Sequence, residues 1–145
     1  MLDNIYNKKI RPIAISIVKN NDKILVYERK DEITNNSFYR LVGGCIEFGE
    51  KSNEALKREF REELSLEIEK LKLLSSFESI FTFNGIQMHE IVFLYESRFK
   101  EKKIYDKKSI DGLEGERAFK AIWMPISDFL SEKHIIYPEE VADYL

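Results

Sequence analysis

The chain has 145 residues, 43% of them hydrophobic, which is enough for one domain with a sizeable core. Its net charge of −3, from 23 basic and 26 acidic residues, argues against nonspecific binding to a nucleic-acid duplex. No apolar run is long enough to span a membrane, and the single cysteine, Cys45, excludes an internal disulfide framework. We therefore expect one cytoplasmic domain over residues 1–145, with no membrane partner.

Six segments are rich in β-branched and aromatic residues and are bounded by turn residues, which predicts β-strands. They span residues 13–17, 23–29, 38–42, 71–83, 86–99 and 118–124. Asn84-Gly85 separates the two longest segments and is a strong signal for a β-hairpin. The stretch 100–117 is charged and contains glycine, so we interpret it as a connecting loop.

Helical patterns follow the third strand and the last strand. Ser52 is the predicted N-cap of the first helix, and Glu54 lies in its first turn, where the helix dipole favours an acid. Pro125 ends the last strand before two short helical segments, over residues 127–132 and 138–145. Strands on both sides of one central helix, with helical segments at the end, predict an α/β sandwich with a mixed sheet.

The central helix carries acidic residues beside its apolar stripe. At about 100° per residue, the stripe is formed by Leu56, Phe60 and Leu64. Three glutamates border it, namely Glu59, Glu62 and Glu63. Like charges at this spacing repel one another, so the pattern favours a bound cation, and Mg²⁺ prefers carboxylate oxygens that it can combine with phosphates. Taken alone, the helix also fits a solvated surface on which Lys57 and Arg61 pair with glutamates.

Together with the residues before it, this helix resembles the box of the Nudix hydrolases. That box reads Gly, five residues, Glu, seven residues, Arg-Glu, an aliphatic residue, any residue, Glu-Glu, any residue, Gly and an aliphatic residue. These places hold Gly44, Glu50, Arg58, Glu59, Phe60, Glu62, Glu63, Ser65 and Leu66. Two positions depart from the pattern. Phe60 still fills an apolar place, whereas Ser65 puts in doubt the left-handed helix end that glycine favours.

The resemblance implies a Nudix-type α/β/α sandwich with a mixed β-sheet. It also implies metal-dependent hydrolysis of a phosphoanhydride bond in a nucleoside diphosphate linked to another group, as in a nucleoside triphosphate, a nucleotide sugar or a dinucleotide. The implied metal is Mg²⁺, with Mn²⁺ as an alternative. If the ligand positions of the family apply to the matching residues here, the candidate metal ligands are the Gly44 carbonyl, Glu59, Glu62, Glu63 and, on a later strand, Glu96.

The candidate catalytic residues are Glu50, Arg58, Glu59 and Glu62. We favour Glu59 as the general base, with Glu114 and Glu116 as alternatives on a later loop. Arg58 precedes Glu59 directly and should not share its direction. It can instead reach back to Glu50 and hold the glycine turn against the helix.

The substrate is less well defined by the sequence, because residues 80–84 lack the markers of known Nudix subgroups. Phe81 and Phe83 are candidates for stacking on a base, or for cross-strand packing. His89 is a candidate substrate contact, or a partly buried strand histidine, and Trp123 fits a base pocket or the core. A small-molecule nucleotide is the expected partner, and a homodimer is possible. The alternative function is a nucleotide-binding sensor without catalysis, which the retained box glutamates disfavour.

Overall fold

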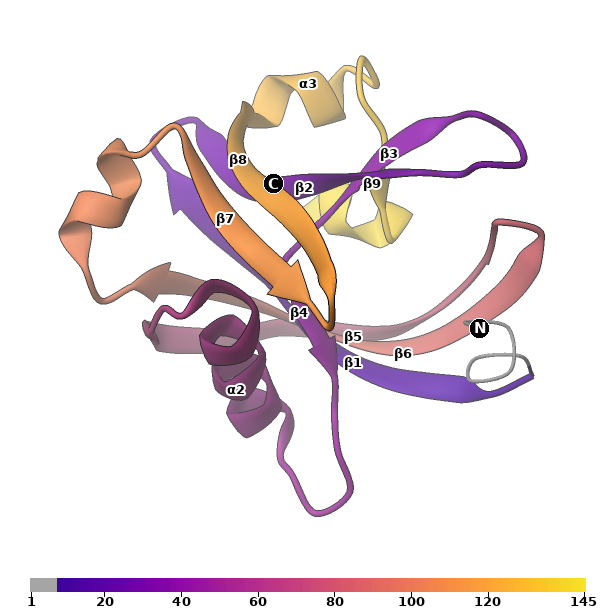
Figure 1. The fold of residues 1–145 in the computed structure, drawn as a ribbon, viewed down its shortest axis with the longest axis horizontal. Helices are drawn as coiled ribbons and strands as arrows, with labels where there is room; N and C mark the ends of the chain where they lie inside the picture. The colour runs from indigo at the N-terminus through magenta and orange to yellow at the C-terminus, as the bar shows by residue number, and fades with distance from the viewer. Residues whose placement is uncertain (1–7) are drawn as a thin grey trace.

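Strands make up most of the structure, a computed structural model that describes residues 8–145 (Figure 1). The strands are β1 (Ile10–Asn20), β2 (Lys23–Lys30), β3 (Ser37–Arg40), β4 (Gly43–Cys45), β5 (Ile68–Phe83), β6 (Ile86–Phe99), β7 (Ser109–Glu114), β8 (Arg117–Pro125) and β9 (Ile136–Tyr137). The helical elements are α2 (Ser52–Leu64), the 3₁₀ segment η1 (Lys102–Asp106), α3 (Ile126–Leu130) and the 3₁₀ segment η2 (Glu139–Tyr144). None of the helices within this described part has the length and apolarity needed to cross a bilayer.

The long strand β1 belongs to two sheet regions and joins them. Along one region, β5, β6, β1 and β4 are neighbours, with β6 parallel to β1 and β4 antiparallel to it. In the other region β2 lies between β3 and β8, β7 flanks β8, and β9 runs parallel to β3. The predicted mixed sheet is therefore confirmed.

Helical elements cover opposite sides of the strands (Figure 1). On one side, α2 buries Leu56, Phe60 and Leu64 against β1, β2 and β8. On the other side, Phe129 of α3 and Val141 of η2 belong to a second cluster of buried hydrophobic residues. This arrangement is the predicted α/β/α sandwich, and it follows from the apolar stripe of α2 having to face a sheet.

The start of α2 differs from the prediction. Its N-cap is Lys51, whose backbone N–H donates to Glu54 Oε2 at 3.4 Å, and the helix already includes Ser52. The Ser52 hydroxyl lies 2.5 Å from the Tyr95 hydroxyl, across from the helix on β6. Ser52 is thus not the cap, because its side chain is used to fix α2 to the sheet.

The end of α2 has a left-handed residue without glycine. Ser65 has φ 57° and ψ 36°, and its backbone N–H donates to the Arg61 carbonyl at 3.0 Å. The chain therefore reaches the expected helix end by placing a serine in a conformation that glycine adopts at less cost.

The sequence predicts a connecting loop over residues 100–117, but the structure differs. These residues contain η1 and the strand β7, which pairs with β8 around Gly115. The charged residues of β7 occupy exposed positions, and they obscure the apolar alternation by which a strand is predicted. The hairpin of β7 and β8 packs beside α2, and this brings its tip close to the helix glutamates.

Candidate functional site

The two glycines of β4, which precede the turn into α2, leave no room for side chains. A Cβ atom on Gly43 would lie 2.1 Å from the backbone oxygen of Ala14 on β1. A Cβ atom on Gly44 would lie 2.5 Å from Cδ of Glu59. The Glu59 carboxyl group therefore rests on the backbone of Gly44, and a side chain at this position would displace it.

Glu59 and Glu63 form a close pair of carboxyl groups that is largely shielded from water. Glu63 is 7% exposed, and its Oε2 atom has no hydrogen-bond partner within residues 8–145. Burial and the neighbouring Glu59 raise the pKa of Glu63 to about 9, and burial also raises the pKa of Glu59. At neutral pH and without a cation, Glu63 is therefore protonated, and a hydrogen bond joins its carboxyl group to that of Glu59.

Arg58 links the glycine turn to the helix, and the predicted pair with Glu50 is present. Arg58 Nε donates to Glu50 Oε2 at 2.7 Å, and Nη2 donates to Glu50 Oε1 at 3.0 Å and to the Cys45 carbonyl at 2.9 Å. The expectation that Arg58 points away from Glu59 is wrong. Its Nη1 donates to Glu59 at 2.9 Å and to Glu62 at 3.1 Å, because the long side chain curls back along the helix.

Glu62 lies at the rim of the acidic pair, with 58% of its side chain exposed. Glu62 and Glu63 line a hollow of about 690 Å³, whose other wall is the hairpin of β7 and β8. Within the described residues, no three acidic, histidine or cysteine side chains already converge into a metal cage. The donor set still suits a hard dication, because Glu63 has a buried oxygen without a partner in residues 8–145, and its carboxyl group lies beside that of Glu59 on the Gly44 backbone.

Glu96 is not brought to this cluster. Its Oε1 atom lies 3.2 Å from Nζ of Lys19, which is the ion pair of an ordinary surface acid. Successive residues of a strand face opposite sides, and Tyr95 faces α2 through its contact with Ser52. Glu96 therefore faces away from the helix glutamates.

The two loop alternatives lie at the tip of the hairpin between β7 and β8. Glu114 forms a close ion pair with Arg117 and lies 3.7 Å from Arg29. Glu116 is exposed in the turn. Arg117 lowers the otherwise raised pKa of Glu63, which places the hairpin tip within electrostatic range of the acidic pair. The tip thus contributes an arginine to the surroundings of the site.

Phe81 and Phe83 lie across from two arginines, Arg40 and Arg29, that no sequence motif singles out. The guanidinium carbon of Arg29 is 4.8 Å from the ring centre of Phe83, and that of Arg40 is 5.4 Å from the ring centre of Phe81. Strand alternation could have placed Tyr27 and Arg29 on one face, but only the fold puts that face opposite β5.

Arg40 in turn contacts the buried carboxylate of Glu90. Its Nη2 atom donates to Glu90 Oε1 at 2.9 Å, and Arg11 Nη1 lies 3.6 Å from Glu90 Oε2. Glu90 is 1% exposed. The two arginines thus compensate the negative charge of Glu90, which would otherwise be costly to bury between the two sheet regions.

His89 and Trp123 do not join the site. His89 pairs in register with Ile80, so it faces the side of the sheet opposite to Phe81 and Glu90. Its Nε2 atom is buried and has no partner in the described structure. Trp123 is partly buried and packs against the core, with its ring centre 5.5 Å from that of Tyr105, which fits the core interpretation and not the base pocket.

Solved structures with this fold come from several bacteria. The MutT NUDIX hydrolase from Burkholderia pseudomallei is 20% identical, with a TM-score of 0.68 over 93% of this chain and 96% of that one. A NUDIX hydrolase from Nitrosomonas europaea is 16% identical, with a TM-score of 0.65 over 93% of this chain and 85% of that one. A MutT protein from Bacillus halodurans is 20% identical, with a TM-score of 0.57 over 86% and 74% of the two chains.

The family comparison covers nearly the whole sequence. The model of the NUDIX domain matches residues 9–144, which include both sheet regions, the glycine turn and α2. The chain belongs to the Nudix hydrolase family, as the box from Gly44 to Leu66 had predicted.

Proposed function

We propose that this protein hydrolyses a phosphoanhydride bond in a nucleoside diphosphate linked to another group, and that it does so with Mg²⁺ or Mn²⁺. The observation that carries the proposal is the pair of Glu59 and Glu63, which is largely shielded from water and lies on the backbone of Gly44. Carboxylates are costly to bury together, and a dication is the partner that relieves this cost.

The residues that would hold the metal are Glu59, Glu63 and the Gly44 carbonyl, with Glu62 at the rim. When bound, such an ion neutralises charge on phosphate oxygens and lowers the pKa of a water. Arg58 holds Glu59 and Glu62 in place through its hydrogen bonds and is anchored by Glu50. We favour Glu59 as the general base, because Arg58 and the Gly44 backbone hold its carboxyl group in place.

The substrate in this proposal is a small nucleotide, and Phe81 and Phe83 are the candidate contacts for its base. Aromatic rings of this kind offer stacking surfaces. A cytoplasmic location and a possible homodimer remain predictions of the sequence.

A substrate panel separates hydrolysis from the alternative, a sensor that binds nucleotides without turnover. The protein is incubated with Mg²⁺ or Mn²⁺ and with nucleoside triphosphates, nucleotide sugars and dinucleotides. Release of phosphate, pyrophosphate or a nucleoside monophosphate from at least one compound is expected. Saturable binding without any product would support the sensor instead.

Substitutions then test the assigned residues. Glu59→Gln and Glu63→Gln should each lower turnover by about 100-fold or more, since a lost base or ligand typically costs this much. Glu67→Gln is the matched control, because Glu67 follows the same helix but pairs with Arg61 at the surface. Equal turnover in all three variants would contradict the roles proposed for Glu59 and Glu63.

A further inference from the structure

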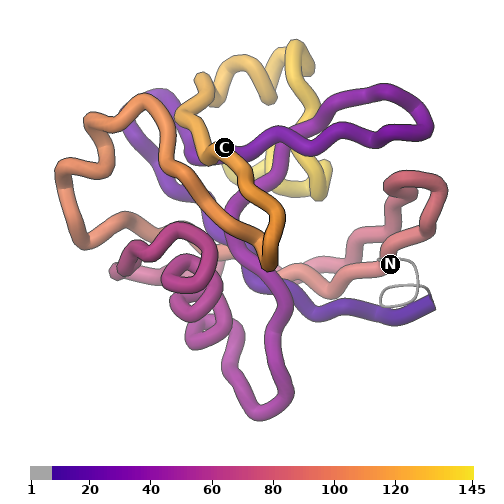
Figure 2. The backbone as a smooth tube through the Cα atoms, viewed as in Figure 1, coloured from indigo at the N-terminus to yellow at the C-terminus, as the bar shows by residue number. Residues whose placement is uncertain are grey.

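Strand β5 forms one end of the strand order in the described structure. Within residues 8–145 it pairs only with β6, and the order runs from β5 at one end to β9 at the other. β5 and β6 run side by side to one edge of the molecule (Figure 2). From residue 75 to residue 83 the pairing has no register shift, and this stretch contains no proline or lysine. The outer edge of β5 therefore lacks the bulges, prolines and lysines that commonly protect edge strands.

A hollow of about 620 Å³ lies along this outer edge, between the two ends of the strand order. Residues 78–82 of β5 form one wall, and Tyr137 of β9 and residues of η2 form the other. Successive residues of a strand face opposite sides, so a hollow lined by five residues in a row follows the edge of β5 and not one of its faces. The hollow is therefore placed to receive another extended segment.

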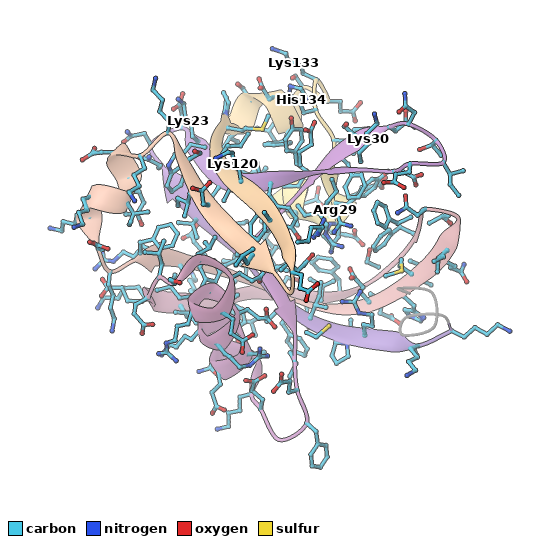
Figure 3. The ribbon with its side chains drawn as sticks, viewed as in Figure 1. Lys23, Arg29, Lys30, Lys120, Lys133 and His134 are labelled. Atoms are coloured by element: carbon cyan, nitrogen blue, oxygen red, sulfur yellow. The ribbon has the colours of Figure 1, made fainter. Side chains whose placement is uncertain are left out.

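Four carboxyl groups line the hollow, and none of them has an ion pair within the described part of the chain. They belong to Glu78 on β5 and to Glu139, Glu140 and Asp143 on η2. The basic residues that precede η2, Lys133 and His134, lie at the upper edge of the molecule in Figure 3, and His134 Nε2 lies 4.0 Å from Asp128 Oδ2. The hollow thus carries negative charge that these residues do not neutralise.

Ser79 adds a second polar feature to the same hollow. Only 8% of this residue is exposed, and its hydroxyl group has no hydrogen-bond partner among residues 8–145. Polar groups so largely removed from water normally have a partner. The hydroxyl group, the carboxyl groups and the strand edge therefore await one common ligand.

The alternation of β5 indicates the chemistry of that ligand. Phe77 and Phe81 face η2, because Phe77 packs against the second hydrophobic cluster and Phe81 stacks on Tyr137. Glu78 and Ile80 face the other way, and Ile80 is 61% exposed. In a strand added to this edge, every second side chain would meet the carboxyl groups of η2, and those between would lie beside Ile80.

A second copy of this chain would fit the edge poorly. Pairing of β5 with β5 of another copy would bring both sets of four carboxyl groups to one junction. The whole chain also has a net charge of −3. Because like charges across a contact oppose association, the occupant of this edge should carry positive charge.

We propose that residues 78–82 of β5 bind an extended basic peptide, which joins the sheet as a further strand. Its backbone pairs with β5, and its alternate lysine or arginine side chains meet the carboxyl groups of η2. Apolar residues between them pack on Ile80. The hollow contains none of the helix glutamates, so this binding surface goes beyond the proposed function.

Nuclear magnetic resonance titration of isotope-labelled protein at low ionic strength tests the proposal. The probe is Lys-Val-Lys-Val-Lys-Val with both ends capped, and Glu-Val-Glu-Val-Glu-Val is the control of opposite charge. Two further versions of the basic peptide carry N-methyl groups on the backbone nitrogens of either the lysines or the valines. Alternate residues of a strand direct their backbone groups to opposite edges, so only one of these two versions can pair with β5.

We expect the basic peptide to shift the backbone signals of residues 75–83 in a saturable manner. One N-methyl version should bind and the other should not, and the acidic peptide should not bind. The proposal is overturned if the basic peptide does not bind, if both N-methyl versions behave alike, or if the acidic peptide binds equally. Shifts of the same signals with protein concentration alone would assign the edge to a second copy and also overturn it.

Two double variants test the carboxyl groups. Glu140→Gln with Asp143→Asn should weaken binding of the basic peptide about fivefold, since each exposed ion pair contributes little. Asp22→Asn with Asp106→Asn is the matched control, because it removes the same charge from two exposed acids outside the hollow and should leave the affinity unchanged. Equal affinities of the two double variants would contradict the proposal. No titration measures hydrolysis, so the substrate panel is decided independently.

Discussion

Glu63 and Glu90 are both buried, with 7% and 1% of their surface exposed, yet their surroundings are opposite. Glu90 accepts a hydrogen bond from Arg40 and lies near a second guanidinium group. Glu63 lies beside another carboxyl group, and one of its oxygens has no partner within residues 8–145. A buried charge needs compensation, so Glu90 receives it from the chain, whereas Glu63 needs it from a bound ligand.

Glutamine substitutions at these two positions should give the largest contrast in stability. Glu90→Gln leaves Arg40 buried without an opposing charge and should lower the free energy of unfolding by about 3 kcal/mol. Glu63→Gln should cost far less at pH 7 without metal, because the amide replaces a carboxyl group that is still protonated there. Urea unfolding of both variants measures the difference, and equal losses would show that the two glutamates are not opposite cases.

The pH dependence of stability sharpens the same contrast. The pKa of Glu63 is about 9 in the folded protein and 4.5 ordinarily, so the folded state binds a proton that the unfolded chain releases. Its contribution to stability is complete below pH 4.5 and is lost as the pH rises to about 9, by up to about 1.4 kcal/mol per pH unit.

Urea unfolding with a chelator between about pH 5 and pH 9 measures this loss. Glu63→Gln should flatten the decline, and so should saturating Mg²⁺, which replaces the proton. A decline that persists unchanged in Glu63→Gln would assign it to other groups.

The smallest expected effect concerns the helix end two residues after Glu63. Ser65→Gly should raise the free energy of unfolding by about 0.5 kcal/mol, because glycine adopts the observed φ of 57° at less cost. Turnover should stay unchanged, since no charge near Glu63 is altered. Thermal or urea unfolding with a parallel activity assay checks this, and a loss of stability would mean that the serine side chain contributes a contact of its own.

Local patterns were sufficient for much of the fold. The hairpin at Asn84-Gly85, the helix stripe of Leu56 and Phe60, and the pair of Arg58 with Glu50 depend on residues close in the chain. The strand β7 could not be recognised in this way, because its exposed charged positions obscure the alternation that marks a strand.

The sequence by itself determined the family and the row of helix glutamates, because spacing along one helix sets which side chains share a face. Only the tertiary structure decided which of those acids is buried, that Glu96 and His89 face elsewhere, and that Arg29 and Arg40 meet Phe83 and Phe81. These outcomes depend on strand register and on the packing of segments far apart in the chain, and neither is encoded in any local pattern.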